Sequence, residues 1–508
     1  MEKMLVRFFL VLVACCFVRN GCGLNILGVF PAHGYSQYLI GSSLMTELAR
    51  RGHNVTVIAP HRQNQAIQNY SEIYVEGLEN FEADLNLFDL EKDYTIWKVY
   101  SLYQLGLTFT EHTLANKAVQ QFLASNQSFD LVICEQFATE ALYGFAWHFN
   151  APLVMFSTIG PSEWISDKAG YPLPFSYVPH GLSKFTSHMN FIQRFENVYV
   201  HIFDIIYRNM FAYPTQNKVA QKYFSGIPHL DLIMYNVSLF LTNSHVAITE
   251  PVPVTPNVIE VGGLQISHRK LPKDLQDFLD GASHGSIYLS MGSNLRSRDL
   301  TNEQKMVFVN TFSKLKQRVL WKYEEDKLPS KQPSNVMIRK WLPQQDVLAH
   351  PNVKAFISHG GLLGSTEAAF SGVPIIGIPI FGDQKMNVAK LVTKGTTIHV
   401  PYNSLSEESL TNALNKILNN SKYNDAAKRL SSILNDQQTK PMDRAIYWIE
   451  YVHRHRGAPF LKPASLELMW YQYFAVDVLL ATCTLLSIPI VIYCIISKCK
   501  YRIKDKLE

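Results

Sequence analysis

A single histidine, His33, lies in the loop PAHGY between an apolar run and a helical pattern. The run at residues 25–30 has the composition of a buried strand, and Ile40, Leu44 and Leu48 give the following helix one apolar face. The N-terminus of a helix carries partial positive charge and disfavours imidazolium, which suits a neutral general base. Most isolated loop histidines are structural, so His33 alone leaves both interpretations open.

A second group of residues that could do chemistry lies in the segment that begins at Trp341. An apolar run ends in His359-Gly360-Gly361, and a helical pattern begins within the following LLGSTEAA. Glycines let a diphosphate approach the backbone closely, and the N-terminus of the helix offers free N–H groups and partial positive charge. The imidazole of His359 can donate one more hydrogen bond. This turn therefore has the composition of a diphosphate site.

Residues around this turn could bind the other parts of a sugar nucleotide. Trp341 offers a flat apolar face on which a base could stack, and Glu367 could bind the two hydroxyls of a ribose. Asp383 and Gln384 follow the next apolar run and could bind sugar hydroxyls. Each residue alone has a simpler structural explanation, as a core tryptophan, a helix-surface glutamate or a loop-capping aspartate. Their combination in this order favours nucleotide-sugar binding.

The elements that position these residues are expected to be parallel α/β structure, because short apolar runs alternate with helical patterns on both sides of a proline-rich break. The strand candidates are residues 25–30, 55–58, 131–134, 153–157, 286–290, 319–321, 336–339, 355–358, 375–378 and 397–400. We expect an N-terminal domain at 24–248, a linker at 249–260, and a C-terminal domain at 261–456 whose final helix packs back. Two doubly wound domains place a ligand in a cleft at the carboxyl ends of their strands.

Both ends of the chain carry apolar segments. Residues 1–23 have the basic start, apolar centre and small-residue exit of a signal peptide, and an uncharged run at 478–496 is long enough to span a bilayer. The juxtamembrane segment 457–477 carries acidic residues, whereas the tail 497–508 is basic, which predicts a type I protein with a cytosolic tail. The closing KDKLE resembles a dilysine retrieval signal, so we expect the endoplasmic reticulum membrane.

Composition narrows the class of protein further. The 508 residues are 47% hydrophobic and 18% charged with a net charge of +5, which excludes disorder and makes nucleic acid an unlikely partner. Of the seven cysteines only Cys134 lies in the expected lumenal part, so no intrachain disulfide is expected there, and no zinc spacing occurs. Candidate glycosylation sites are Asn54, Asn69, Asn126, Asn236 and Asn419.

The segment from Trp341 to Gln384 resembles the donor signature of the family 1 UDP-glycosyltransferases, which runs from a tryptophan to an Asp-Gln dipeptide over the same 44 residues. The resemblance extends over almost the whole chain, through the loop of His33, the VGGL and MGS sequences, the apolar span and the basic tail, and is greatest to the insect branch. It implies the GT-B fold, in which two Rossmann-like domains face each other across a cleft.

The resemblance also implies roles for individual residues. Trp341 would stack on uracil with Gln344 against the uridine, Glu367 would bind the ribose, and Asp383 with Gln384 would bind the hexose. The diphosphate would be held by Ser293, His359 and backbone amides such as that of Gly361. This chain departs from the family at Leu363, where an asparagine commonly touches the phosphate. Ser365 or Thr366 would have to supply that contact.

By the same resemblance, His33 would deprotonate the acceptor, and Glu135 stands where most members have an aspartate that orients the histidine. Asp130 is the second candidate for that carboxylate. The reaction would be a single displacement with inversion, and no metal or other cofactor is expected because the chain has no Asp-x-Asp motif. The partners expected are a UDP-sugar, a small lipophilic or phenolic acceptor and the membrane, and a homo-oligomer is left open.

Several alternatives stay open at this point. The donor could be UDP-glucose, as in most insect relatives, or UDP-glucuronate. A non-catalytic lumenal carrier of lipophiles would keep the aromatic N-terminal half, and the replacement at Glu135 is its best support. A sugar-nucleotide epimerase of the same fold would usually lack the membrane anchor.

Overall fold

The computed structural model describes residues 23–63, 65–78 and 94–504. In this part of the chain, seven parallel strands form a first sheet in the order β3-β2-β1-β4-β5-β6-β7. They are β1 (Asn25–Val29), β2 (Asn54–Ala59), β3 (Tyr70–Tyr74), β4 (Leu131–Glu135), β5 (Leu153–Ser157), β6 (Leu239–Thr242) and β7 (Val258–Glu260). The central strands are buried on both faces, as expected of a parallel sheet covered by helices.

A second sheet of six parallel strands, again counted in the described residues, has the order β10-β9-β8-β11-β12-β13. It contains β8 (Ser286–Ser290), β9 (Arg318–Lys322), β10 (Val336–Arg339), β11 (Val353–Ser358), β12 (Ile375–Gly377) and β13 (Thr397–His399). Both orders reverse direction once, between β1 and β4 and between β8 and β11, so each half is doubly wound.

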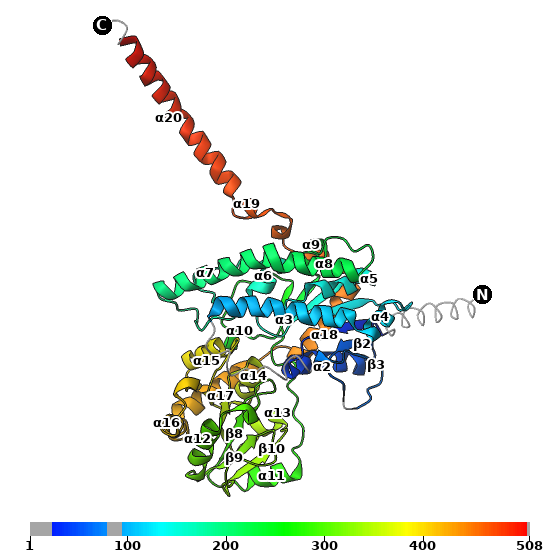
Figure 1. Ribbon diagram of the computed structural model, residues 1–508, viewed down its shortest axis with the longest axis vertical. Helices are drawn as coiled ribbons and strands as arrows, with labels where there is room; N and C mark the ends of the chain where they lie inside the picture. Colours follow the sequence, from blue (N-terminus) through cyan, green and yellow to red (C-terminus); the bar gives the residue numbers. More distant parts are fainter. Residues whose placement is uncertain (1–22, 64, 79–93, 505–508) are drawn as a thin grey trace, which may run out of the picture.

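Helices cover both sheets and fill the connections between the strands (Figure 1). In the first half they are α2 (Tyr35–Arg50), α3 (Thr95–Ala115), α4 (Lys117–Leu123), α5 (Gly144–His148), α6 (Glu163–Ala169), α7 (Phe191–Tyr207), α8 (Tyr213–Tyr223), α9 (Asp231–Met234) and α10 (Val246–Thr249). In the second half they are α11 (Lys273–Asp280), α12 (Asn302–Ser313), α13 (Gln344–Leu348), α14 (Leu362–Ser371), α15 (Gln384–Thr393), α16 (Glu407–Asn419), α17 (Ser421–Asn435) and α18 (Pro441–Arg454).

Every strand expected from the sequence is present, with ends within two residues of the expected ones. The structure adds three strands. Edge strand β3 carries polar residues, and β6 has only four residues and follows a long stretch, residues 158–238, in which the sequence showed no clear strand pattern. Strand β7 lies inside the segment 249–260 that we expected to be a linker, and it pairs with β6 as the last strand of the first sheet.

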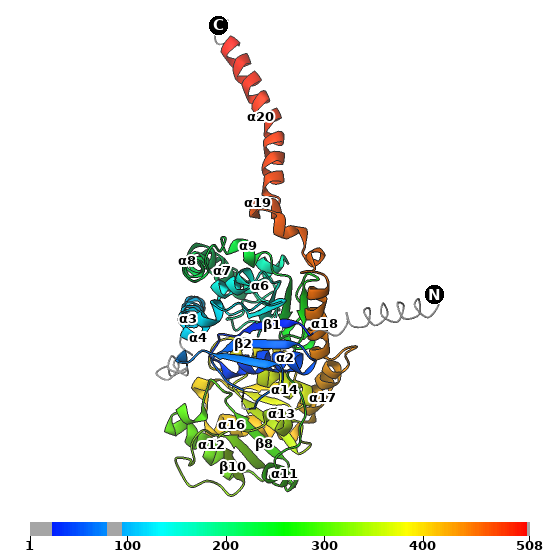
Figure 2. The same ribbon diagram turned by 90° about the vertical axis from the view of Figure 1, so that its right-hand side faces the viewer.

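The last helix of the second half, α18, returns to the first half. Its apolar face, formed by Ala445, Ile446, Ile449 and Val452, is buried in one hydrophobic cluster with residues of α2 and the first sheet. Figure 2 shows α18 lying along the side of the first sheet, beside β1 and α2. The two halves are therefore joined by a returning helix as well as by the chain between β7 and α11.

Helix α20 (Val476–Lys504) extends away from the two halves and is preceded by the short helix α19 (Trp470–Tyr473) (Figure 1). Within the described residues it is the one helix long and apolar enough to cross a membrane, with a mean hydropathy of 2.4 over its best window and no buried residue there. The expected signal peptide at 1–23 lies almost entirely outside the described residues, as do the last four residues of the tail.

Candidate functional site

A cavity of about 800 Å³ lies between the two halves, where the carboxyl ends of both sheets face each other. The loop that carries His33 follows β1 and Glu135 ends the neighbouring β4, so both residues lie where the first sheet reverses its strand order. Ser293 follows β8 and His359 follows the neighbouring β11, so they lie at the equivalent position of the second sheet. Ligands of doubly wound sheets bind at these reversal points.

His33 is half-buried at the edge of the cavity, whose wall begins with the next residue, Gly34. The two halves approach closely here, because a Cβ built on Gly34 would lie 3.0 Å from Asn294 Nδ2 of the second half. The ring of His33 stacks on that of His61, with centroids 5.1 Å apart, and His61 Nε2 donates to the His33 carbonyl oxygen at 2.6 Å. His61 therefore fixes the loop of His33.

Glu135 is buried, with only 1% of its surface exposed, which excludes the solvated strand end that is the simplest alternative for it. Its Oε2 accepts a hydrogen bond from the backbone N–H of Ala32 at 3.3 Å, and its Oε1 has no hydrogen-bond partner in the described part of the chain. Burial raises the pKa of Glu135 to about 8, and the bond from Ala32 opposes that rise. Glu135 thus contacts the loop of His33 through the backbone. Asp130 lies at the opposite end of β4, where it accepts from Asn25 N at 2.8 Å.

His359 sits in a space formed by glycines at the expected diphosphate position. A Cβ built on Gly292 would lie 2.5 Å from the imidazole, and one on Gly361 would lie 2.4 Å from it, so larger residues at either position would displace the ring. Gly361 caps the N-terminus of α14, which points free N–H groups toward the cavity wall. Burial, helped by the positive charge of Lys322, lowers the pKa of His359 to about 4. The ring is therefore neutral and can donate a hydrogen bond without carrying charge.

Trp341 is more than half exposed and lies on the cavity wall, so it does not belong to the core. Its ring is perpendicular to that of Tyr35 from the first half, with centroids 5.2 Å apart, and Lys322 Nζ lies 5.7 Å from its centroid. Lys322 lies over the ring on one side, and the exposed remainder of the indole suits stacking with a base.

A chain of hydrogen bonds leads from the second sheet to Glu367. Tyr288 Oη donates to Gln344 Oε1 at 3.1 Å, Gln344 Nε2 donates to Glu367 Oε2 at 2.6 Å, and Gln345 Nε2 donates to Glu367 Oε1 at 3.0 Å. All four residues lie on the cavity wall. Burial raises the pKa of Glu367 to about 7, while the two glutamines lower it. The carboxylate is thus held in one orientation, as binding a pair of vicinal hydroxyls requires.

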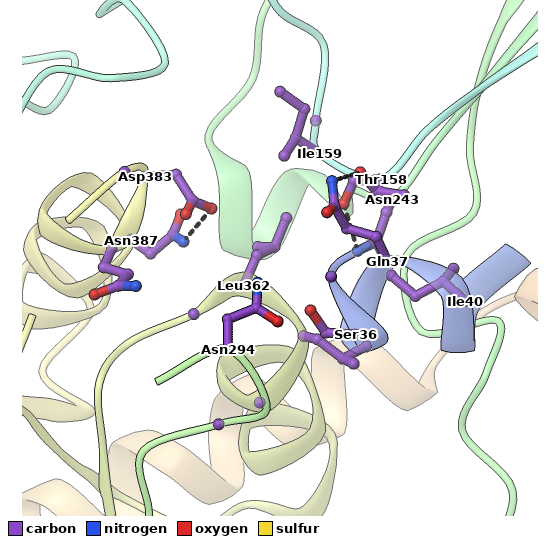
Figure 3. A pocket seen from close by; sticks show the side chains of 18 of the residues that line it. Ser36, Gln37, Ile40, Thr158, Ile159, Asn243, Asn294, Leu362, Asp383 and Asn387 are labelled. Carbon is purple, nitrogen blue, oxygen red and sulfur yellow. Dashed lines mark hydrogen bonds between the residues drawn. The ribbon is translucent and has the colours of Figure 1, made fainter. Parts of the chain in front are cut away.

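Asp383 and Gln384 line the cavity at the start of α15. Gln384 Oε1 accepts from the backbone N–H groups of Ile380 and Phe381 at 2.9 and 3.2 Å, so its oxygen fixes the preceding turn. Asp383 Oδ2 accepts from Asn387 Nδ2 at 2.8 Å, as Figure 3 shows, and burial raises the pKa of Asp383. The carboxylate of Asp383 and the amide of Gln384 therefore lie side by side on this wall.

The first half contributes polar groups that the sequence analysis did not identify. Gln37 Nε2 donates to Thr158 Oγ1 at 3.3 Å, and Asn243 Nδ2 donates to the Thr158 carbonyl oxygen at 3.0 Å (Figure 3). Asn243 Oδ1 is buried and has no hydrogen-bond partner among the described residues. In Figure 3, Asn294 of the second half lies near Ser36 at the start of α2. The sequence does not indicate these neighbours, because they are far apart along the chain and, for Asn294 and Ser36, lie on different halves.

The part of the cavity away from the second sheet is mainly apolar. Its wall comes from α3, from the start of α6 and from the loops around them, through Leu102, Leu105, Phe109, Phe137, Ile159, Trp164, Tyr177, Val178 and Leu182. Pockets that bind small organic ligands combine such a wall with a few polar groups.

The structure brings most of the expected site residues together. Those on the cavity wall are Ser293, Trp341, Gln344, His359, Gly361, Glu367, Asp383 and Gln384. Ser365 is buried outside the wall, and its hydroxyl has no hydrogen-bond partner in the described chain, whereas Leu363 lies on the wall. Thr366 is also buried away from the wall, so neither hydroxyl replaces the missing asparagine in this arrangement.

The expected glycosylation sites lie away from the cavity. The five sequon asparagines are exposed on the surface of the described chain: Asn54, Asn69, Asn126, Asn236 and Asn419. No group of three or more His, Cys, Asp or Glu side chains that could hold a metal ion occurs in the described ranges.

Comparison with known sequences gives one family. Residues 26–508 match the family model for UDP-glucoronosyl and UDP-glucosyl transferase. UDP-glycosyltransferase UGT5 from Dactylopius coccus is 36% identical, with 96% of this chain and 94% of the relative covered. UDP-glucosyltransferase 2 from the same organism is also 36% identical, with 97% and 95% covered. Human UDP-glucuronosyltransferase 2B7 is 32% identical, with 96% and 95% covered.

Comparison with solved structures gives the same architecture at much lower identity. Glycosyltransferase VinC in complex with DTDP superposes with a TM-score of 0.60 at 16% identity, covering 85% of this chain and 100% of that chain. Spinosyn forosaminyltransferase SpnP superposes with a TM-score of 0.56 at 17% identity, covering 84% and 99%. These likenesses, with the two doubly wound sheets, confirm the expected GT-B fold.

Proposed function

Because the chain belongs to the UDP-glucoronosyl and UDP-glucosyl transferase family, we propose that it transfers a hexose, glucose in the first instance, from a UDP-sugar to the hydroxyl of a small lipophilic or phenolic acceptor. Transfer of a sugar from a UDP-sugar is the activity of the family. The observation that carries the finer proposal is that one cavity has the diphosphate turn and Glu367 on one side and an apolar wall on the other.

In the proposed reaction, His33 acts as the general base. Its imidazole takes the proton of the acceptor hydroxyl as the oxygen attacks the anomeric carbon of the sugar. The new bond forms on the face opposite UDP while the bond from that carbon to the diphosphate oxygen breaks, so the configuration inverts. The position of His33 at the reversal point of the first sheet, where that sheet faces the second, supports this role.

The departing UDP gains negative charge, and three features of the second half would stabilise it. The N-terminus of α14 offers backbone N–H groups, His359 offers a neutral donor, and Lys322 carries a positive charge on the cavity wall. Stabilisation by these groups is consistent with our proposal that the reaction needs no metal, for which the sequence-level support is the missing Asp-x-Asp motif.

We assign Glu135 the part of a positioning residue. Its carboxyl holds the loop of His33 through the N–H of Ala32, and a carboxylate buried behind that loop would favour the imidazolium that forms when His33 takes a proton. Because burial raises the pKa of Glu135 to about 8, this carboxyl is largely neutral at neutral pH until a positive charge forms near it.

UDP-glucuronate is the second candidate donor, and one residue favours it. Lys390 lies on the cavity wall beside Asp383, is buried, and donates to the carbonyl oxygen of Thr249 at 3.0 Å. A buried ammonium group at the proposed sugar position could pair with a sugar carboxylate.

We further propose that α20 anchors the protein in the membrane of the endoplasmic reticulum, with both halves in the lumen. The length and exposure of α20, the basic residues that follow its apolar run, and the terminal dilysine pattern support this orientation.

The test is a transfer assay on microsomes that contain the full chain. A panel of UDP-sugars is offered with a panel of phenols and aliphatic alcohols, and the masses of the products are measured. We expect hexosyl products from UDP-glucose that disappear in His33→Ala, and Lys390→Met should leave them in place. Glucuronosyl products that Lys390→Met removes would favour the second donor. Binding of UDP-sugar and phenol without any product would favour the carrier.

A further inference from the structure

Helix α7 has its polar and apolar faces reversed relative to a helix on the surface of a soluble domain. Its inward face carries the buried residues Asn197, Val200, His201 and Asp204, three of them polar, and Arg208, just after its end, is buried as well. Its outward face carries Phe191, Ile192, Phe195, Tyr199, Ile202 and Ile206, which are 46–69% exposed and which we call the α7 surface. A soluble surface helix shows the opposite arrangement.

Hydrogen bonds fix this orientation. Asn197 Oδ1 accepts from His180 N at 2.8 Å, and its Nδ2 donates to the Val178 carbonyl oxygen at 2.9 Å. Asp204 Oδ1 accepts from Tyr103 Oη at 2.9 Å. Turning the helix to bury its apolar side would break these hydrogen bonds and leave their buried partners, the Tyr103 hydroxyl among them, unpaired. The apolar side must therefore find a partner outside the two halves.

The α7 surface lies at the end of the molecule from which α20 departs. Figures 1 and 2 both show α7 and α9 at that end, with α19 above them. The segment before α19 is fastened to the same end, because Ser465 Oγ donates to the Gly170 carbonyl oxygen at 2.7 Å and Lys462 Nζ donates to that of Asn236 at 3.0 Å.

Further exposed apolar side chains surround this end. After α7 they are Met210, Phe211 and Leu232, and beside α19 they are Leu468, Met469, Trp470 and Phe474. On α7 itself, Glu196 is the single charged residue among the exposed positions of this described helix. Exposed apolar side chains gathered at one end of the molecule in this way mark a site of contact with a protein or a membrane.

We propose that the α7 surface lies in the interface of the membrane that α20 crosses, parallel to it, with its aromatic and branched side chains among the lipid head groups and upper acyl chains. This proposal rests on the anchoring by α20 proposed above. A lipid surface is the occupant rather than a second copy, because the fastened segment at Lys462 and Ser465 keeps α7 next to the bilayer in every molecule. Amphipathic helices bind interfaces in this way.

The loop that leads into α7 also lines the cavity, through Tyr177, Val178, Pro179 and Leu182. A membrane-seated α7 would therefore place the apolar wall of the cavity next to the lipid, where lipophilic acceptors accumulate.

The experiment uses the full chain in liposomes of phosphatidylcholine and phosphatidylglycerol, with one nitroxide label per molecule and the other cysteines replaced. The query label is at Tyr199→Cys, and Phe195→Cys is a second variant of the same face. Native Cys483 in α20 is the lipid control, and Asp277→Cys on α11, at the opposite end of the molecule, is the water control (Figure 1). The ratio of collision rates with oxygen and with a water-soluble nickel chelate is measured at each label.

We expect the ratio at both α7 labels to be several-fold higher than at Asp277 and nearer to that at Cys483. A ratio equal to that at Asp277 would overturn the proposal. If the label at Cys483 is exposed to water, α20 is not inserted, and both the anchoring and the membrane contact of α7 are refuted. If Cys483 is in lipid and the two α7 labels are in water, only the membrane contact of α7 is refuted. Dipolar coupling between Tyr199 labels of two molecules would assign the surface to a second copy instead. Circular dichroism and the thermal midpoint of each variant control for folding.

Discussion

Replacing Glu135 with glutamine should change how the stability of the protein depends on pH. The carboxyl is buried and its pKa rises from 4.5 to about 8 in the folded protein, so the folded state holds a proton that the unfolded state has lost between these values. The stability associated with the neutral carboxyl is therefore fully present below pH 4.5 and is lost as the pH rises to about 8. Glutamine keeps the acceptor for the Ala32 N–H and cannot ionise, so it escapes this loss.

The magnitude follows from the linkage between protonation and folding. One pH unit in this range corresponds to about 1.4 kcal/mol, so between pH 5 and pH 7 the wild type should lose about 2 to 3 kcal/mol relative to Glu135→Gln. Over the whole interval between the two pKa values of Glu135, the wild type would lose about 5 kcal/mol of unfolding free energy. Relaxation of the structure around the ionised carboxylate makes this loss smaller. The assay is urea unfolding of the detergent-solubilised full chain, followed by tryptophan fluorescence at several pH values.

The matched control is Glu408→Gln, which makes the same chemical change at an exposed position of α16. Its unfolding curve should stay parallel to that of the wild type from pH 5 to pH 8. If Glu135→Gln also runs parallel to the wild type over this range, Glu135 ionises as a solvated carboxyl does, and the reasoning from its burial is wrong.

Other predictions concern the site and the membrane. His33→Ala should lower turnover by ~10²- to 10⁴-fold while UDP binding measured by calorimetry stays within about twofold, and a variant that keeps a tenth of wild-type turnover would exclude His33 as the base. Glu367→Gln should raise KM for the UDP-sugar ~10-fold or more, because a charged acceptor is lost at the proposed ribose position, whereas an unchanged KM would place the ribose elsewhere. Protease added to sealed microsomes should remove only residues of the tail 497–508, and digestion of the two halves without detergent would refute the lumenal assignment.

The fold could be predicted from the sequence because most strands are continuous apolar runs. Parallel strands buried on both faces need such runs, and the runs at 153–157, 286–290 and 336–339 coincide with β5, β8 and β10. Strand β3, with the sequence YSEIY, lies at the edge of the sheet and is partly exposed, so it lacks that pattern. Strand β7 has only three residues and follows a proline-rich segment, so the sequence pattern did not indicate a strand there.

That the residues expected to bind the donor meet on one cavity wall could also be predicted, because they lie within one stretch of sequence and one domain. Trp341, His359, Glu367 and Asp383 all reach the cavity wall. The partners of these residues from the other half could not be predicted. The contact of Tyr35 with Trp341 joins residues more than 300 positions apart and depends on how the two halves meet.

Helix α7 was not among the elements expected from the sequence, and its orientation could not have been predicted either. Sequence periodicity shows that a helix has two faces but not which face is turned inward. The usual assumption buries the apolar face, and here the buried Asn197, His201 and Asp204 reverse it. Glu135 was correctly placed at the end of a strand, but its burial and its bond to the Ala32 backbone depend on the neighbouring strand β1.

The return of α18 to the first half constrains the order in which the protein can fold during synthesis. The hydrophobic cluster beneath α2 stays open until Ala445, Ile446, Ile449 and Val452 have left the ribosome, although β1 and α2 are made first. Packing of the N-terminal half therefore stays incomplete, with part of its apolar surface exposed, until the entire C-terminal half has been synthesised. The chain that follows α18 leads through α19 into α20, so closure of the first half and arrival of the apolar α20 follow each other closely. A nascent chain that stops before residue 441 would present this open surface to chaperones.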